Sequence, residues 1–341
     1  MRNSQILVIR EELEEKKKKP HGSKKLLKSP TARWNLIKAE LTELADSYPQ
    51  PRRTKIVANL DEPEFVAEDF IVDEDTFVLV TEQGWVKRQG SVKDVDSTRV
   101  RKGDRVKWVA AGSTKASVAF FSSKGVCYVA RMADIEQTTG HGQPVQSLFK
   151  MGDGERVVGV IGMDPRFLDV PAPTEGAEEP EAPYGVAVTK LGMTLRFSLR
   201  AHRDPSTRSG RKFTRPKDDD DVIYVAPCHP DAAVGVASRS GRALICESEE
   251  IALLSGAGRG VMMMKLQKDD ELIAARILEY EDDVLIVQKD GGSEYKIAVN
   301  KYEIVSRGGK GFQLFKRGEL SEEVYQAPRV PSFEDDVEGE E

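Results

Sequence analysis

The sequence has few cysteines and histidines, and it has no long apolar run. Its three cysteines, Cys127, Cys228 and Cys246, are far apart, so we expect neither a disulfide framework nor a zinc site. The four histidines show no metal-ligand spacing, and no Ser/His/Asp grouping can be read from the sequence. No segment approaches the roughly 18 apolar residues of a membrane span, and the N-terminus lacks the apolar core of a signal peptide. We therefore expect a cytoplasmic protein with no membrane partner.

What the sequence does contain is a repeated pattern of apolar strand, glycine turn and second strand. A two-stranded hairpin cannot bury its own apolar face, so the copies must pack against one another. The five copies occupy residues 76–88, 117–131, 184–199, 233–246 and 283–297.

The spacing of the turn glycines indicates the architecture. Successive glycines are 41, 67, 49 and 50 residues apart, and the long interval contains a Pro/Glu/Ala-rich stretch at 165–183 that we expect to be an insertion outside the core. A period of roughly 40 to 50 residues predicts an all-β, propeller-like disc of about five four-stranded blades. A β-sandwich with an unrelated run of hairpins is the alternative. The turn glycines are Gly84, Gly125, Gly192, Gly241 and Gly291.

Charge is distributed unevenly along the chain and suggests three regions. Residues 1–60 carry 14 Lys/Arg against 7 Asp/Glu, whereas residues 319–341 carry 1 against 9. We expect a helical segment and linker at 1–58, the disc at 59–320 and an acidic disordered tail at 321–341. The tail either keeps the chain soluble or acts as an autoinhibitor, competing with a polyanionic ligand for basic residues elsewhere in the chain.

Basic residues concentrate at the ends of the hairpins and in the glycine-rich connectors that follow them. In a radial arrangement of blades, equivalent positions fall on one rim, and a cationic rim suits the phosphates of a duplex. Any single cation can instead be a solvated strand end. The candidate DNA-binding residues are Lys87, Arg88, Arg99, Arg101, Lys102, Arg105, Arg131, Arg196, Arg208, Arg211, Lys212, Arg242, Arg259, Arg307, Lys310, Lys316 and Arg317.

One glycine-rich connector combines absent side chains with cations, so that backbone amides can approach a phosphate. It is not a Walker A motif, because Lys310 is followed by Gly311 and Phe312 instead of Ser or Thr. We therefore expect no ATP site and no cofactor in this chain. The segment consists of Ser306, Arg307, Gly308, Gly309, Lys310 and Gly311.

The hairpins at 76–88 and 184–197 and the connector at 256–277 resemble repeats of the C-terminal domain of bacterial type IIA topoisomerase A subunits, the family of gyrase and topoisomerase IV. The resemblance covers roughly residues 70–320. It implies a β-pinwheel, a propeller-like disc that binds and bends duplex DNA around a basic rim. It also implies two protein partners, the A-subunit core and the ATPase B subunit, which use ATP and Mg²⁺ on other domains.

The N-terminal region extends this resemblance. Apolar residues with helical spacing are followed by Pro49, as in the last helix of the family's breakage-reunion core before an Arg-Arg-Thr exit, here 52–54. Residues 6–19 resemble the end of the other coiled-coil arm. A generic surface helix is the alternative interpretation. The spaced apolar residues are Trp34, Ile37, Leu41 and Leu44.

Two features of the family are missing from the sequence. The family's cleaving subunit cuts DNA with a tyrosine next to an arginine, and none of the eight tyrosines here follows an arginine, so we expect no catalysis by this chain alone. Whether it is a fragment, half of a split subunit or a separate module stays open. Gyrase places its box in the first blade, where residues 90–108 have none, and the nearest match is the degenerate segment 306–311. This favours a topoisomerase IV-like chain over a gyrase-type one. A propeller scaffold that binds another protein is the alternative function.

Overall fold

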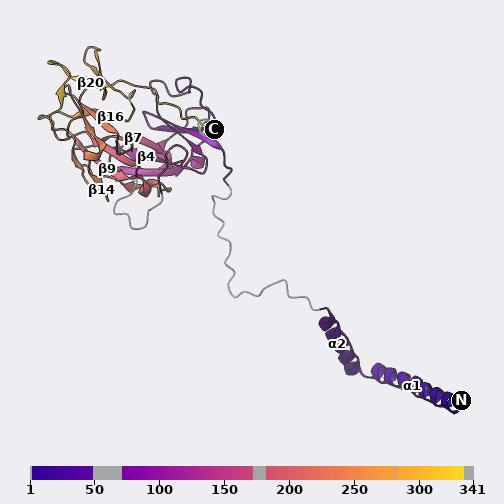
Figure 1. The fold of residues 1–341 in the computed structure, drawn as a ribbon. Helices are drawn as coiled ribbons and strands as arrows, with labels where there is room; N and C mark the ends of the chain where they lie inside the picture. Colours follow the sequence, from indigo (N-terminus) through magenta and orange to yellow (C-terminus); the bar gives the residue numbers. More distant parts are fainter. Residues whose placement is uncertain (1, 49–70, 172–181, 281, 334–341) are drawn as a thin grey trace, which may run out of the picture. The chain divides into compact units, whose positions relative to one another are not determined.

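The computed structural model describes residues 2–48, 71–171, 182–280 and 282–333 (Figure 1). The chain divides into two units, Met1–Phe65 and Val66–Glu341. The expected boundary at residue 58 and the Arg-Arg-Thr exit fall outside the described residues.

The first unit is helical and consists of α1 (Arg2–Lys28) and α2 (Pro30–Ser47). Ser29 caps α2 by accepting the amide of Ala32 at 3.3 Å, and Pro30 suits the first helical turn because it has no amide to satisfy. No side chain of α2 is buried, and Trp34 is 71% exposed. The helix therefore presents an exposed apolar stripe, formed by Trp34, Ile37, Leu41 and Leu44. Among the described helices, none is long and apolar enough to cross a membrane.

Five antiparallel hairpins form the frame of the second unit. Each turn holds its repeat glycine at positive φ, from 77° at Gly125 to 97° at Gly291, a conformation that glycine adopts without strain. The hairpins are β1 (Asp75–Thr81) with β2 (Trp85–Gln89), β4 (Ser117–Ser122) with β5 (Val126–Arg131), β8 (Tyr184–Thr189) with β9 (Met193–Ser198), β12 (Ala233–Ser238) with β13 (Arg242–Glu247), and β17 (Leu285–Lys289) with β18 (Glu294–Ile297).

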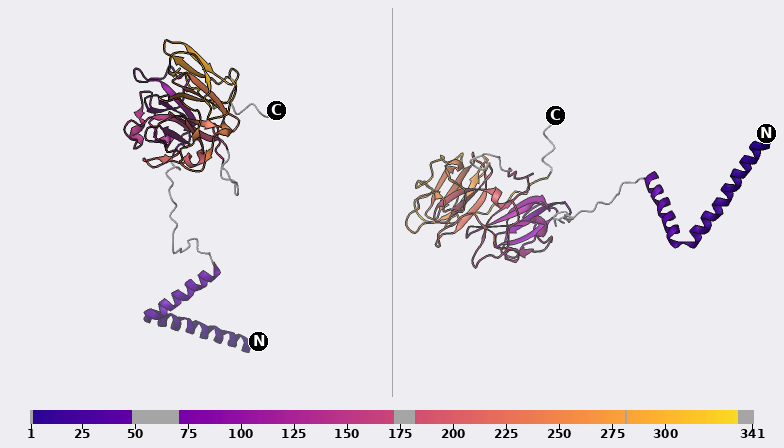
Figure 2. Two further views of the ribbon diagram at one scale, coloured as in Figure 1. Left: turned by 90° about the vertical axis from the view of Figure 1, so that its left-hand side faces the viewer. Right: turned by 90° about the horizontal axis from the view of Figure 1, so that it is seen from below.

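Each hairpin gains an inner strand that pairs with its first strand. The inner strands of consecutive blades contact one another and surround a central channel of about 480 Å³. Figure 2 shows the blades from two further directions, with early blades in purple and late blades in orange. The inner strands are β3 (Val106–Ser113), β7 (Val157–Gly162), β11 (Val222–Cys228), β16 (Leu272–Leu278) and β20 (Leu320–Glu323).

Neighbouring blades exchange a short outer strand. The connector after each hairpin, from the second to the fifth, supplies two residues that pair with the outer strand of the preceding blade. Among the described residues, the last blade receives no exchanged strand and has three strands, with β18 at its edge. The exchanged strands are β6 (Gln143–Pro144), β10 (Arg211–Lys212), β15 (Val261–Met262) and β19 (Phe312–Gln313).

Short elements fill the remainder of the connectors. β14 (Leu253–Leu254) pairs in parallel with β9, and the α-helical turn α3 (Val145–Leu148) follows β6. Three connectors begin with a 3-10 turn, at Met132–Asp134, Leu199–His202 and Ser248–Glu250.

The apolar cores lie between adjacent blades. They also include residues of the Pro/Glu/Ala-rich stretch, which was expected to lie outside the core. Phe167 packs on the first-blade cluster and Val170 is 6% exposed, so the expectation that 165–183 contributes nothing to the core is wrong for its first part. Three large apolar residues, Phe167, Leu168 and Val170, among prolines and charged residues give no periodic signal. Residues 172–181 lie outside the described residues. At the other end, β20 continues to Glu323 and Phe333 packs on the disc, beyond the expected start of the tail at 321.

The predicted all-β disc of about five blades, with a short helical segment before it, is confirmed. The strand exchange is the feature that the repeat pattern did not predict.

Candidate nucleic-acid interface

The connectors carry alternating charge, so the outer edge of the disc is not uniformly cationic. The first, third and fifth connectors hold 5, 7 and 5 Lys/Arg against 3, 5 and 2 Asp/Glu, whereas the second and fourth hold 2 and 3 against 4 and 5. Because each connector from the second onward covers the preceding blade, the basic third and fifth connectors cover blades 2 and 4. The connectors are residues 90–105, 132–156, 199–221, 248–271 and 298–319.

The first connector forms the blade 1 patch, which consists of Arg99, Arg101 and Lys102. All three side chains are exposed. The Arg101 guanidinium lies 3.7 Å from the centre of the Trp85 ring, which orients the cation without neutralising it.

Lys87 was expected to join this surface, and that expectation is wrong. Its side chain is 2% exposed, and its Nζ donates to the carbonyl oxygens of Arg99 at 2.7 Å and Gly140 at 2.9 Å. Burial, assisted by the charge of Arg99, lowers the pKa of Lys87. The lysine therefore ties the first and second connectors to β2 from inside the protein.

The third connector forms the blade 2 patch, which consists of Arg208, Arg211 and Lys212, all exposed. Arg208 donates to the carbonyls of Ser147 at 3.0 Å and Leu148 at 3.2 Å in the second connector. Arg211 donates to the carbonyl of Ala201 at 2.8 Å within its own connector. Carbonyls are neutral partners, so these arginines are held in position while keeping their positive charge.

The fifth connector forms the blade 4 patch, which consists of Arg307, Lys310, Lys316 and Arg317. Arg307 donates through Nε to the carbonyl of Glu250 at 2.7 Å, and Lys310 is exposed two residues before β19. The box-like segment 306–311 therefore leads directly into an exchanged strand.

Three further candidates, Arg88, Arg196 and Arg242, are half-buried and donate to backbone carbonyls of the connector that covers their blade. Arg88 and Arg196 occupy equivalent places, half-buried, and donate through Nε to the carbonyls of Ile135 at 3.3 Å and Ile251 at 2.8 Å. Arg242 donates to the carbonyls of Lys310 and Gly311, both at 3.3 Å. Arg131 is half-buried at the end of β5, and the remaining candidate, Arg259, is exposed before β15.

Arg105 lies in the central channel instead of on the outer edge, so its assignment to a rim is wrong. Its Nε is 2.8 Å from the Glu82 carboxylate, and its guanidinium lies 4.5 Å from the centre of the Tyr325 ring. Burial raises the pKa of Glu82, but Arg105 and Lys107 outweigh it and the pKa is lowered overall. Residue 105 ends the first connector, where the chain has already turned inward toward β3.

Sequence reasoning missed a glycine that precedes every exchanged strand. Gly142, Gly210, Gly260 and Gly311 all have positive φ, and a Cβ at each would meet a backbone carbonyl of the neighbouring outer strand. The only signal in the sequence is a glycine directly before each of the pairs Gln143-Pro144, Arg211-Lys212, Val261-Met262 and Phe312-Gln313, and no residue type is common to these four pairs.

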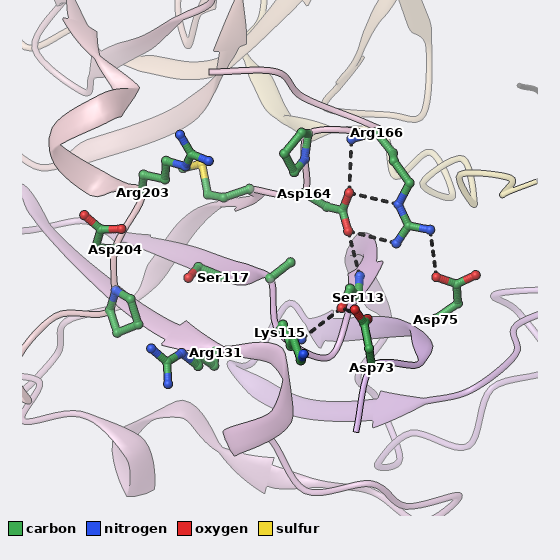
Figure 3. Close-up of a pocket in the computed structure, with 14 residues that line it drawn as sticks. Asp73, Asp75, Ser113, Lys115, Ser117, Arg131, Asp164, Arg166, Arg203 and Asp204 are labelled. Carbon is green, nitrogen blue, oxygen red and sulfur yellow. Dashed lines mark hydrogen bonds and ion pairs between the residues drawn. The ribbon is translucent and has the colours of Figure 1, made fainter. Parts of the chain in front are cut away.

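A polar cavity of about 500 Å³ lies away from these patches, beside the ends of β3 and β5 (Figure 3). Arg166 is held there between Asp164 at 2.9 Å and Asp75 at 2.8 Å, and Ser113 donates to Asp73. Four aspartates and four Lys or Arg side chains line this cavity, so it does not form a uniformly cationic surface. Among the described residues, no group of His, Cys, Asp or Glu is arranged to hold a metal ion.

Comparison with known proteins gives a consistent result. The family model described as DNA gyrase C-terminal domain, beta-propeller, matches residues 116–161 and 236–279. The chain is 27% identical over 299 residues to the DNA gyrase A subunit of Mycobacterium leprae, covering 84% of this chain and 22% of that one. It is 26% identical over 324 residues to the DNA topoisomerase 4 A subunit of Streptococcus pneumoniae, covering 92% and 37%.

Solved structures agree on the fold. The C-terminal domain of DNA topoisomerase IV superposes with a TM-score of 0.62 at 19% identity, covering 74% of this chain and 78% of that one. The E. coli ParC C-terminal domain gives 0.57 at 16%, covering 75% and 100%. The chain spans about a fifth to a third of the length of the curated relatives it matches. The expected resemblance to the C-terminal β-pinwheel of type IIA topoisomerase A subunits is confirmed, and the matches include both gyrase and topoisomerase IV.

Proposed function

We propose that this chain binds and bends duplex DNA, without sequence preference, through the cationic patches on blades 1, 2 and 4. The observation that carries the proposal is the bonding of the connector arginines. Arg208, Arg211 and Arg307 are held by backbone carbonyls, so their charge remains available for phosphate. By contrast, Lys190 and Arg239 in the channel share the Glu271 carboxylate.

The energetics of this function follow from the geometry. Each phosphate that meets a cation releases condensed counterions, and this gain offsets an elastic cost of order 1 to 6 kcal/mol for bending a duplex of 20 to 30 base pairs. Arginines fixed before binding lose little conformational entropy when a phosphate arrives. The acidic second and fourth connectors separate the cationic patches. A bound duplex would therefore contact the disc at the patches on blades 1, 2 and 4 and not along its whole edge.

We further propose that the chain acts as the C-terminal part of a type IIA topoisomerase A subunit in the cytoplasm, next to the nucleoid. Its protein partners are then the A-subunit core and the ATPase B subunit. The exposed stripe of α2, with Trp34 and Leu41, supplies an apolar surface for the core. ATP and Mg²⁺ act on those partners, and this chain contributes DNA geometry without a cofactor of its own.

A protein-binding scaffold is the second candidate. The observation that favours it is a half-apolar groove of about 620 Å³ between β10 and β14, floored by Phe197 and Phe213 and walled by Leu253 and Leu254. Arg211 and Lys212 line the same groove, so a scaffold and a DNA surface would compete for it.

Neutralising the blade 2 patch tests the proposal. We expect Arg211→Gln with Lys212→Gln to weaken binding of a random-sequence duplex. The slope of log affinity against log salt should become shallower by about 2, roughly one for each lost contact. The measurement is fluorescence anisotropy across a salt series.

The matched control is Lys124→Gln with Lys190→Gln, because these lysines pair with Asp221 and Glu271. This pair should leave affinity and slope unchanged. Equal effects of the two double variants would mean that binding follows net charge, without a defined surface.

A further inference from the structure

The first and last blades are joined differently from every other neighbouring pair. Exchanged strands link blades 1 to 2, 2 to 3, 3 to 4 and 4 to 5, whereas no described strand of the last blade pairs with a strand of the first. Residues 324–333, which follow β20, run from the last blade to the first. We call this segment the C-terminal strap.

The start of the strap is bonded to both blades. On the last blade, the Val324 amide donates to the Ile286 carbonyl at 2.8 Å, and Gln326 Nε2 donates to the Val284 carbonyl at 3.0 Å. On the first blade, the Tyr325 hydroxyl donates to the Val106 carbonyl at 2.8 Å. Arg105 lies over the Tyr325 ring and completes this bridge across the seam.

The end of the strap is anchored by one aromatic ring. Phe333 meets Phe77 and Phe167 edge to face, with ring centres 5.2 and 5.1 Å apart, and Val330 packs on the same cluster. The Arg166 guanidinium lies 5.0 Å from the centre of the Phe333 ring. As Figure 3 shows, Asp164 and Asp75 hold Arg166 at its edges, which leaves its planar face for the ring.

We propose that the C-terminal strap is a clasp that holds the disc closed in place of a fifth strand exchange, and that Phe333 is its lock. The four exchanged strands are each fixed by sheet hydrogen bonds and by a glycine packed against a carbonyl. The seam depends instead on a half-buried ring and a few isolated hydrogen bonds, so it is the place where the disc opens at least cost. Opening there changes the curvature of the outer edge.

Spin labels on either side of the seam test this proposal. Ser91→Cys in the first connector and Glu294→Cys in β18 place labels at exposed positions, and all three native cysteines are fully buried. Electron paramagnetic resonance of the full chain should give one narrow distance distribution. In Phe333→Ala the distribution should broaden and move to longer distance.

The control is Phe149→Ala, which removes a ring that packs on Phe120 and Tyr128, away from the strap. Phe149 is the more deeply buried of the two phenylalanines, and its removal should leave the distribution unchanged. Equal broadening in both variants would overturn the proposal, because it would reflect general loosening.

Phe333→Leu guards against loss of folding, since it keeps apolar volume while removing the ring from Arg166. We expect an intermediate shift, together with faster amide hydrogen exchange over residues 325–333. A distribution unchanged in both Phe333 variants, or strap amides that exchange no faster, would overturn the clasp. The measurement contains no DNA, so its outcome is independent of the proposed DNA function.

Discussion

At the scale of single residues, charged side chains in this protein differ most in what they bond. Arg208 and Arg211 donate to carbonyls at the surface, Arg105 pairs with a carboxylate in the channel, and Lys87 is enclosed. Their sequence contexts are alike, since each lies in a basic segment near a glycine. Only the first kind offers uncompensated charge to a phosphate.

Lys87 is expected to be a stability residue. Replacing it in Lys87→Met leaves the carbonyls of Arg99 and Gly140 without their donor, which should lower the free energy of unfolding by roughly 1 to 3 kcal/mol. Chemical denaturation measures this change. Duplex affinity at low salt should stay within about twofold.

The comparison variant is Lys102→Met, at an exposed position in the first connector, which follows β2. It should weaken DNA binding without changing stability. If Lys87→Met instead impaired DNA binding while leaving stability unchanged, the assignment of Lys87 to the interior would be wrong.

His202 predicts a pH dependence of stability. It is 4% exposed, is surrounded by Phe121, Phe197 and Phe213, and has an Nδ1 without a hydrogen-bond partner. Burial, with a smaller effect of the Arg211 charge, lowers its pKa to about 4. Between pH 6.5 and 4, His202 binds a proton in the unfolded chain but stays neutral in the folded chain. The free energy of unfolding should therefore decrease as the pH is lowered through this window, by up to about 3 kcal/mol.

Denaturation of the parent and of His202→Asn at pH 7, 6, 5 and 4 isolates this effect, because the other titrating groups are shared. The parent should lose stability more steeply than the variant. Parallel curves would show that His202 titrates alike in the folded and unfolded chain.

At the scale of elements, the exchanged strand is the unit that joins one blade to the next. Each has two residues, too few for any periodicity, and each pairs with a strand from a different repeat. A single left-handed glycine before it lets the chain pass close to the neighbouring carbonyl. Stability should therefore be sensitive to these glycines and insensitive to a connector glycine that has open space and no positive φ, such as Gly256.

Gly260 and Gly256 provide that comparison within one connector. A Cβ at Gly260, where φ is 80°, would meet the Thr194 carbonyl, whereas one at Gly256 would meet nothing within 4 Å. Gly260→Ala should therefore cost about 1 kcal/mol or more, and it should speed hydrogen exchange at Val261 and Met262. Gly256→Ala should change neither the free energy of unfolding nor the hydrogen exchange of Val261 and Met262. If both variants lowered stability equally, Gly260 would have no special role.

These elements also show how far the sequence alone could predict the structure. The hairpins were predictable because a glycine turn and two apolar strands repeat at one period, and α2 because its apolar spacing ends at Pro49. The cationic connectors were also predictable, since Arg211 and Lys310 stand beside glycines. Strand exchange was not, because it depends on contacts between repeats. The interior position of Lys87 and the core role of Phe167 depend on such contacts too.

At the scale of the whole molecule, the disc separates two kinds of charge. In the channel, Arg105 and Lys107 pair with Glu82, and Lys190 and Arg239 pair with Glu271. On the outer edge, arginines such as Arg208 and Arg211 are held by neutral backbone carbonyls. This separation explains how a chain with a net charge of −6 can present the cationic surface that we propose binds DNA. The seam between the first and last blades adds a place where the curvature of that surface can change.

The most direct test of DNA bending uses the full chain and a duplex of about 60 base pairs with a fluorophore at each end. Binding and end-to-end energy transfer are followed together from about 50 to 200 mM salt. We predict that energy transfer rises on binding and that affinity falls steeply and linearly in log salt, as expected for several phosphate contacts. Binding that is indifferent to salt, or that leaves the ends of the duplex as far apart as before, would contradict a DNA-bending disc.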